Sequence, residues 1–292
     1  MYKLSFNTKS LLDCDLKTAL SKIKEAGYEG AEIYLTRAGL NPYTTTDAEI
    51  DDLKSFIDGL GLEITCLDTT DPCLLTDALN LPSLVSNGEG AREARMKSYK
   101  ASIDLAKKLG VPAVIVTSGP FHGKDPDYTT KPADFYKEAF HDEDGSDIYL
   151  LSQLKELAAY AGDTELWFEP TPRFYIRTIA RALEFINGVN SDNFKLLLSV
   201  PNIVKGEHNT MQTDAFTKDI MDKVANIHFA DTRAQIWYHK IPGEGTADLK
   251  GILANIKNTG YDKYVCIDLA RCEEKDEAKQ LNASLDYMKA NA

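Results

Sequence analysis

Three side chains that can bind metal ions or move protons stand at or near the ends of short apolar segments. Glu169 ends the segment Glu-Leu-Trp-Phe-Glu, His228 lies in Val-Ala-Asn-Ile-His-Phe, and Asp268 ends Tyr-Val-Cys-Ile-Asp. One imidazole and two carboxylates offer the nitrogen and oxygen ligands that Mn²⁺, Zn²⁺ or Mg²⁺ accept in proteins. Carboxyl groups are also suited to general acid and base catalysis. If the segments are parallel strands of one barrel, their carboxyl ends meet and the three residues form one site.

Each of these residues also has a simpler structural explanation. Glu169 suits a helix cap or an ion pair, and His228 suits a hydrogen-bonded histidine in the wall of a sheet. Asp268 is the least expected, because an unpaired charge inside an apolar segment is costly. We therefore expect Asp268 to have a cationic partner, which is either a metal ion or an arginine such as Arg233 or Arg271.

The elements that must position these residues alternate along the whole chain, as is typical of a parallel sheet covered by helices. The expected strands lie near 3–8, 30–35, 63–69, 112–118, 164–169, 194–200, 224–230 and 263–269. The expected helices lie near 15–27, 46–61, 90–110, 146–162, 178–188, 214–223, 248–259 and 274–289. Eight alternating units predict an α/β fold, a single (β/α)8 TIM barrel that forms one domain over 1–292. The alternative, an open doubly wound sheet, usually has a glycine-rich first turn, whereas this chain has Asn-Thr-Lys-Ser.

The composition argues against two classes of partner and indicates the cellular compartment. The chain has 292 residues and a net charge of -12, which repels polyanions, so we expect no nucleic-acid partner. The first residues contain no apolar segment long enough for a signal peptide or a membrane span, so we expect no membrane partner. The five cysteines are an odd number without Cys-x-x-Cys spacing, which predicts a reducing, cytoplasmic setting. Composition leaves a homo-oligomer open.

Several motifs resemble those of the xylose isomerase-like TIM barrel superfamily, which includes sugar phosphate isomerases and epimerases, inosose dehydratase and endonucleases of AP endonuclease family 2. In chain order they are Ala-Gly-Tyr-Glu-Gly-Ala-Glu-Ile, Ala-Lys-Lys-Leu-Gly-Val, Phe-Glu-Pro, Ile-His-Phe-Ala-Asp-Thr-Arg, Pro-Gly-Glu-Gly and Gly-Tyr-Asp. The resemblance covers the whole chain and implies the barrel fold. The acidic charge disfavours the endonuclease branch, and so does the lack of that branch's histidine-rich metal cluster.

The resemblance also implies a metal site at the tips of strands five to eight. In the epimerase branch a divalent metal is typically held by Glu, Asp, His and Glu. Glu169 and His228 match the first and third of these ligands, and Asp268 stands where the family has the last Glu. The pattern departs at strand six, where Ser199 occupies the position of the ligand Asp and Asn202 that of a substrate-side histidine. Because Ser199 adds no charge, we expect weak binding of Mn²⁺, Mg²⁺ or Zn²⁺.

Candidates for substrate binding come from strand ends and loops. Glu32 resembles the second-strand glutamate of the family, with a surface ion pair as the alternative. Arg233 can grip an anionic or hydroxylated substrate, with a solvated loop arginine as the alternative. The full set of candidates is Glu32, His122, Asn202, Arg233, Trp237 and His239. The stretches 70–90 and 120–145 are expected to form long loops over the mouth of the barrel.

Three functions fit these residues. The first is a sugar isomerase or epimerase that acts on a small carbohydrate or polyol by metal-assisted proton transfer at carbon, with Glu169 and Asp268 as acid and base. The second is a lyase or dehydratase that acts beside a carbonyl on an oxidised sugar or cyclitol. The third is a non-catalytic barrel that binds a sugar or a partner subunit, which Ser199 and Asn202 favour. Metal content separates the enzymes from the third function, and product identity separates the two enzymes.

Overall fold

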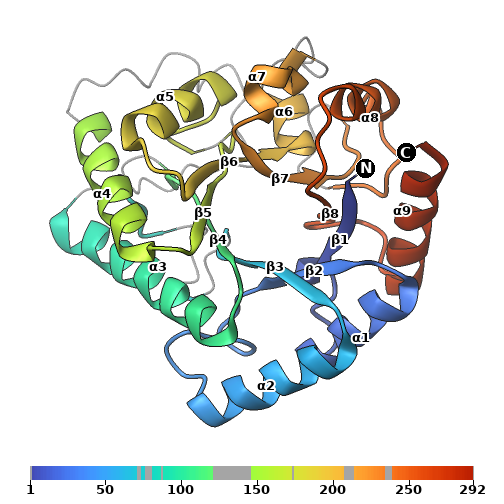
Figure 1. Ribbon diagram of the computed structural model, residues 1–292, viewed down its shortest axis with the longest axis horizontal. Helices are drawn as coiled ribbons and strands as arrows, with labels where there is room; N and C mark the ends of the chain where they lie inside the picture. The colour runs from blue at the N-terminus through green and yellow to red at the C-terminus, as the bar shows by residue number, and fades with distance from the viewer. Residues whose placement is uncertain are drawn as a thin grey trace.

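The strands form a closed parallel barrel in chain order, in which β8 pairs back with β1 (Figure 1). This computed structural model describes residues 2–70, 74–75, 81–86, 88–120, 146–172, 174–206, 214–233 and 239–291. The strands are β1 (Lys3–Asn7), β2 (Gly30–Tyr34), β3 (Glu63–Asp68), β4 (Ala113–Val116), β5 (Glu165–Phe168), β6 (Phe194–Ser199), β7 (Val224–Phe229) and β8 (Tyr264–Ile267). The predicted (β/α)8 TIM barrel is confirmed.

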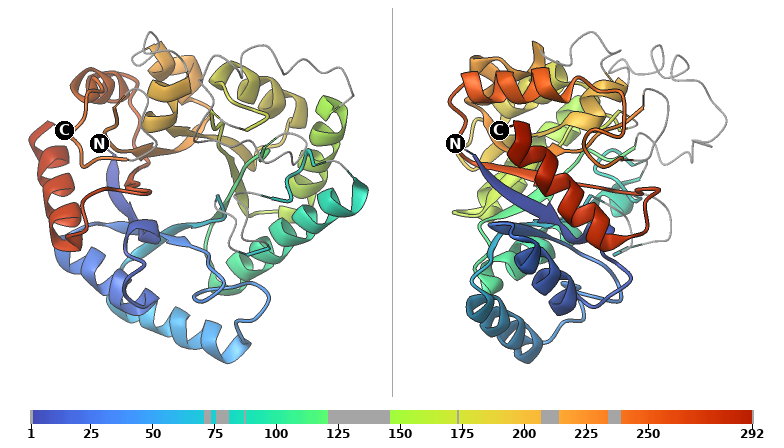
Figure 2. Two further views of the ribbon diagram at one scale, coloured as in Figure 1. Left: turned by 180° about the vertical axis from the view of Figure 1, so that it is seen from behind. Right: turned by 90° about the vertical axis from the view of Figure 1, so that its right-hand side faces the viewer.

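Helices lie around the outside of the ring of strands, as two further views also show (Figure 2). They are α1 (Leu16–Ala26), α2 (Asp47–Leu60), α3 (Glu89–Leu109), α4 (Ser146–Ala161), α5 (Ile179–Val189), α6 (Val200–Gly206), α7 (Lys218–Met221), α8 (Leu249–Asn258) and α9 (Glu277–Asn291), with the 3-10 helices η1 (Thr8–Ser10) and η3 (Asp214–Phe216). Within the described residues, no helix is long and apolar enough to cross a membrane.

The first helices begin and end where the local sequence favours it. Asp15 caps α1 by accepting a hydrogen bond from the backbone N–H of Thr18, and Thr46 forms a capping box with Glu49 at the start of α2. Gly27 ends α1 with a φ of 99°, a left-handed conformation that glycine adopts without a Cβ clash. These signals return the chain to the sheet quickly, so that successive strands can lie side by side.

Alternation along the strands decides which side chains enter the barrel. A buried cluster separate from the larger core comprises Cys66, Ala113, Ile115, Trp167, Leu197 and Ala225, and it fills the barrel interior. Side chains two residues further along a strand point to the same side of the sheet. Asp68, Glu169 and Ser199 each follow a member of this cluster by two residues. They therefore project inward at the carboxyl end of the barrel, which we call the mouth.

Two segments differ from the sequence-based expectation. The expected strand at 194–200 and helix at 214–223 leave a loop between them. In the structure α6 begins directly after β6, with Pro201 in its first turn, where a backbone N–H is not needed for a helical hydrogen bond. We also expect a helix at 214–223. The structure has η3 and the four-residue α7 there instead.

Some expectations fall on residues that the structure does not describe. The loops predicted at 70–90 and 120–145 lie largely outside the described residues. His122 and Trp237, two of the candidates for substrate binding, also lie outside them.

Candidate active site

Glu169, Ser199, His228 and Asp268 lie at the mouth of the barrel. Ser199 in β6 and Cys266 in β8 are both register partners of His228 in β7. Asp268 follows Cys266 by two residues, and Glu169 follows the last residue of β5. The four side chains are buried, with exposed fractions of 6% for Glu169, 2% for Ser199, 1% for His228 and 4% for Asp268. The barrel thus brings together residues that lie about a hundred positions apart in the chain.

The imidazole of His228 is held at one ring nitrogen only. Its Nε2 lies 2.8 Å from Oε2 of Glu32. Its Nδ1 is buried without a hydrogen-bond partner, and Oδ2 of Asp268 lies 3.5 Å away. Burial by itself would lower the pKa of His228, but the negative charges of Glu32, Asp268 and Glu169 outweigh burial and raise that pKa to about 10. With no other cation bound, His228 is therefore protonated at neutral pH.

Glu32 lies behind His228 and not at the surface. Its side chain is fully buried, and its carboxylate accepts hydrogen bonds from Nδ2 of Asn7 and Nδ2 of Asn226 while it contacts His228. The surface ion pair considered from the sequence is wrong, and a direct contact with substrate does not fit, because both oxygens already have protein partners. A carboxylate in this position fixes the orientation of the imidazole ring, as carboxylates behind metal-binding histidines do.

Asp268 has histidine neighbours in place of the arginine considered from the sequence. Nδ1 of His239 lies 2.6 Å from the backbone oxygen of Asp268 and 3.7 Å from its Oδ2. Arg233 and Arg271 are both exposed and do not join the buried cluster. Burial raises the pKa of the Asp268 carboxyl group, but the charges of Lys9 and of the nearby histidines outweigh burial and lower that pKa. Asp268 is therefore ionised at neutral pH.

Glu169 is held by Asn202 from the first turn of α6. Nδ2 of Asn202 donates a hydrogen bond of 2.9 Å to Oε1 of Glu169. Burial raises the pKa of Glu169 to about 7, against the opposing charge of His228. The two acids thus differ, because Glu169 keeps its proton at a pH at which Asp268 has lost one.

Three further residues of this region are absent from the sequence-based candidates. Asn7, the last residue of β1, donates from Nδ2 to Oε2 of Glu32 over 2.9 Å and to Oδ2 of Asp68 over 2.8 Å. Asp68, the last residue of β3, is fully buried, and Nζ of Lys9 lies 2.7 Å from its Oδ2. Asn7 and Asp68 are polar residues at strand ends, the same signal that selects Glu169.

The unpaired atoms beside His228 fit a cation. Nδ1 of His228 and Oγ of Ser199 are both buried without a hydrogen-bond partner, and the Asp268 carboxylate lies next to that nitrogen. An imidazole nitrogen, a hydroxyl and a carboxylate are suitable ligands for Mn²⁺, Zn²⁺ or Mg²⁺. Glu169 stands further back, because its donor atoms do not lie within 4.8 Å of those of both His228 and Asp268 among the residues that the structure describes.

Donor atoms that do lie within 4.8 Å of one another belong to Glu32, His228 and Cys266, on the other side of the imidazole ring. This set is less suited to a metal. The Glu32 oxygens and Nε2 of His228 are already paired. Burial and the charge of Glu32 raise the pKa of the Cys266 thiol well above its usual value, which disfavours the thiolate that binds metals. A cation therefore fits the Nδ1 side of His228 better.

Asp231, the acid that follows β7, organises a loop and does not join the cluster. Its carboxylate accepts hydrogen bonds from the backbone N–H groups of Thr232, Gly243 and Ala247. The Pro-Gly-Glu-Gly motif is thus part of a turn that leads to Asp248, the N-cap of α8.

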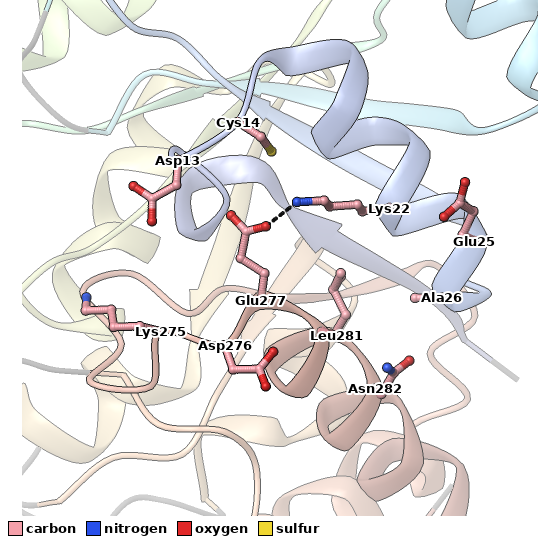
Figure 3. A pocket seen from close by; sticks show the side chains of 11 residues that line it. Asp13, Cys14, Lys22, Glu25, Ala26, Lys275, Asp276, Glu277, Leu281 and Asn282 are labelled. Atoms are coloured by element: carbon pink, nitrogen blue, oxygen red, sulfur yellow. Dashed lines mark hydrogen bonds and ion pairs between the residues drawn. The ribbon is translucent and has the colours of Figure 1, made fainter.

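A surface hollow of about 690 Å³ lies outside the barrel, between α1 and α9 (Figure 3). Lys22 of α1 points toward Glu277 of α9 and forms an ion pair with it, with Cys14 beside the pair. None of the residues of the mouth described above lines this hollow. Its size alone does not make it the active site, because the convergent buried acids lie at the barrel mouth.

The fold and the buried cluster together define a (β/α)8 barrel with acid and imidazole groups at its carboxyl end. The family model described as xylose isomerase-like TIM barrel matches residues 20–291. The chain therefore belongs to the xylose isomerase-like TIM barrel family.

Solved structures with a similar fold include 3-keto-D-glucoside 4-epimerase from E. coli, at 19% identity and a TM-score of 0.73 over 99% of this chain and 100% of that one. D-Psicose 3-epimerase from Clostridium cellulolyticum H10 is 17% identical, with a TM-score of 0.75 over 99% of each chain. The IolI protein with a bound zinc atom is 20% identical, with a TM-score of 0.71 over 99% of each chain.

Among curated proteins, the chain is similar to fructoselysine 3-epimerase from Shigella flexneri and from Escherichia coli O157:H7. Each is 21% identical over 189 residues, which is 64% of this chain. The match spans 63% of the length of either relative.

Proposed function

We propose that the protein is a carbohydrate epimerase or isomerase that moves a proton at a carbon beside a carbonyl group. The observation that carries this proposal is the pair of buried carboxyl groups at the mouth, Glu169 after β5 and Asp268 after β8. Because β6 and β7 lie between these strands in the barrel, the two groups approach a substrate from different directions. A base on one side and an acid on the other is the arrangement that inversion at a carbon atom requires.

Each residue has a defined part in the proposed reaction. One carboxylate takes the proton from the substrate carbon, and the electron pair moves onto the carbonyl oxygen. The other carboxyl group returns a proton as the electron pair moves back to carbon. In an epimerase this proton reaches the opposite face of the same carbon. In an isomerase it reaches the neighbouring carbonyl carbon, while the hydroxyl proton on the first carbon moves to the former carbonyl oxygen. Asn202 orients Glu169 through the hydrogen bond to Oε1. The buried setting reduces competition from water.

The proposal includes a divalent cation, Mn²⁺, Mg²⁺ or Zn²⁺, held by Nδ1 of His228, Oγ of Ser199 and the Asp268 carboxylate. When bound, such a cation supplies Lewis-acid polarisation of a substrate carbonyl. The two unpaired buried atoms, on His228 and Ser199, support this assignment. The zinc atom bound to the structurally similar IolI protein is consistent with it. Glu32 positions the His228 ring for this contact.

The similar proteins support the substrate class. The 3-keto-D-glucoside, D-psicose and fructoselysine enzymes are all named as sugar epimerases. Their identities to this chain are 21% or lower, so they point to a carbohydrate with a carbonyl group and do not select one sugar.

We also propose that residues 1–292 form one domain that works in the cytoplasm without a nucleic-acid partner. The net charge of -12 supports the last point. Cys14, Cys66, Cys266 and Cys272 are free thiols, which fits a reducing compartment.

The test is to incubate the purified protein and Mn²⁺ with D-fructose, D-tagatose or D-allulose and to identify the products by NMR. We expect an epimer or isomer of at least one sugar, and a rate at least about 100-fold lower in Glu169→Gln and Asp268→Asn. Glu25→Gln, on the exposed surface of α1, is the control that should keep the wild-type rate. A dehydrated product would instead establish a lyase, and sugar binding without any product would favour a non-catalytic barrel.

A further inference from the structure

Lys9 is a largely buried cation at the mouth, and the proposed reaction does not use it. It lies in η1, directly after β1, where Oδ1 of Asn7 accepts a hydrogen bond from its backbone N–H over 2.9 Å. Only 10% of its side chain is exposed. An ammonium group is costly to bury, so a lysine in this position needs strong compensation from its surroundings.

The surroundings of Lys9 supply that compensation from several sides. Nζ lies 2.7 Å from Oδ2 of Asp68 and donates a hydrogen bond of 2.6 Å to Oγ1 of Thr70. Nζ also lies 5.0 Å from the centroid of the Tyr34 ring, which is cation–π range. The ammonium group is therefore fixed by contacts from β2, β3 and the residues that follow β3.

The ammonium group of Lys9 belongs to a buried polar network that crosses the mouth. Oδ2 of Asp68, which Lys9 contacts, also accepts a hydrogen bond of 2.8 Å from Nδ2 of Asn7. The same Nδ2 lies 2.9 Å from Oε2 of Glu32, which lies 2.8 Å from Nε2 of His228. Asp68 belongs to β3 and His228 to β7, so these contacts join the ammonium group to the imidazole ring beside the cation site.

The charges of the described mouth residues can be counted. The acids are Glu32, Asp68, Glu169 and Asp268. The basic groups that face them are Lys9, His228 and His239. Ser199 adds no charge. A divalent ion on the Nδ1 side of His228 would displace a proton from that ring and still add positive charge to the network that holds the Lys9 ammonium. In a partly buried site, repulsion of this kind changes binding affinity by about tenfold or more.

We propose that Lys9 is the resident cation of the mouth and sets its affinity for divalent ions. It neutralises the carboxylates when no ion is bound and thereby keeps that affinity weak. The inference rests on the proposed function only for the location of the cation site. It concerns binding and not turnover, so the two can fail separately.

The test is calorimetric titration of Mn²⁺ into the wild type and Lys9→Met. We expect Lys9→Met to bind Mn²⁺ at least about tenfold more tightly, because the repulsion is gone while the ligands remain. Lys17→Met is the matched control, since Lys17 is a partly exposed lysine of α1 that pairs with Asp52 outside the mouth, and it should keep the wild-type affinity. Equal or weaker Mn²⁺ affinity in folded Lys9→Met, or no binding in any variant, would overturn the proposal.

Three more variants keep the test decisive if Lys9→Met does not fold. Lys9→Gln removes the charge but keeps a hydrogen-bond donor for Asp68, so it should also bind Mn²⁺ at least about tenfold more tightly. Lys9→Arg keeps the charge and should retain the wild-type affinity within about threefold. Ser199→Asp adds an anionic ligand and should tighten Mn²⁺ binding even though Lys9 is unchanged in this variant. If Lys9→Arg and Lys9→Gln bind Mn²⁺ equally, the charge of Lys9 does not set the affinity.

Discussion

At the scale of single residues, His228 connects the buried polar groups to the reacting side of the mouth. Glu32 holds one ring nitrogen at 2.8 Å, and the other ring nitrogen faces Asp268 without a hydrogen bond. The orientation of the His228 ring depends on Glu32, whose side chain is fully buried. A residue buried behind the imidazole therefore decides how the ring is oriented.

Glu32→Gln is expected to destabilise the fold by about 2–3 kcal/mol, because an amide NH₂ group would face donors from Asn7, Asn226 or His228 inside the barrel. Urea unfolding at pH 7 measures the change. The control is Glu25→Gln on the exposed surface, which should alter stability by less than about 0.5 kcal/mol. Similar unfolding midpoints for the two variants would show that the Glu32 contacts contribute little.

Asp68 makes stability depend on pH in the acid range. Its pKa is lowered to about 2 in the folded protein, although burial alone would raise it, because Lys9 and the hydrogen bonds of the Asp68 carboxylate favour the charged form. A lowered folded-state pKa gives stability that is present above the unfolded value, about 4, and is lost as pH falls toward 2. We expect the contribution to be roughly 2 kcal/mol.

The measurement is denaturant unfolding of the wild type and Asp68→Asn at several pH values. The difference in stability between them should be constant above about pH 4.5 and should shrink as pH falls from 4 to 2. A difference that stays the same across this range would contradict the lowered pKa of Asp68.

At the scale of elements, the strand ends explain both what the sequence predicts and what it misses. Glu169, His228 and Asp268 stand out in the sequence because each is a polar residue within or at the end of an apolar segment. Asn7 and Asp68 run directly into polar stretches, so they look like loop residues until the register of the strands is known. The inward direction of a side chain depends on that register, which no single segment fixes.

The sequence alone also gives little sign of α6 or of the direction in which Glu32 points. Asn202 reaches Glu169 only because a helix begins at once after β6, and a seven-residue helix with a proline gives little periodic signal. Glu32 lies in a strand that is buried throughout, where alternation between exposed and buried positions is absent. The barrel itself was predictable because strand and helix periods alternate over the whole chain. The roles of the site residues and the single domain stay predictions.

The loop between β7 and α8 is held by close packing against Asp231. A Cβ atom at position 245 would lie 2.1 Å from Oδ1 of Asp231 and 2.5 Å from the backbone oxygen of Thr232. Gly245→Ala should therefore destabilise the fold by about 2–3 kcal/mol. Gly59→Ala in α2, where a Cβ meets open space, is the control and should stabilise by about 0.5–1 kcal/mol. Thermal unfolding of both variants measures the effects, and an unchanged Gly245→Ala would refute the packing argument.

At the scale of the whole molecule, the closed barrel turns distant segments into neighbours. Contacts at the mouth join β1, β2 and β3 to β7, β8 and the residues that follow them, through the chain from Lys9 and Asp68 to Asn7, Glu32 and His228. Asp68 and Asp268 stay charged because Lys9 and the histidines lie among the acids, whereas burial raises the pKa of Glu169 to about 7. The hollow between α1 and α9 is outside this network (Figure 3).

The central claim is that Glu169 and Asp268 move a proton at a substrate carbon. The most direct measurement is exchange of carbon-bound hydrogen with solvent deuterium, followed by NMR while D-fructose or D-tagatose is incubated with the protein and Mn²⁺ in ²H₂O. We predict that deuterium enters at a carbon beside the carbonyl group with the wild type and with Glu25→Gln, and that exchange is lost in Glu169→Gln and Asp268→Asn. Sugars that keep all their carbon-bound hydrogen with the wild type, or exchange that is undiminished in both variants, would contradict this account.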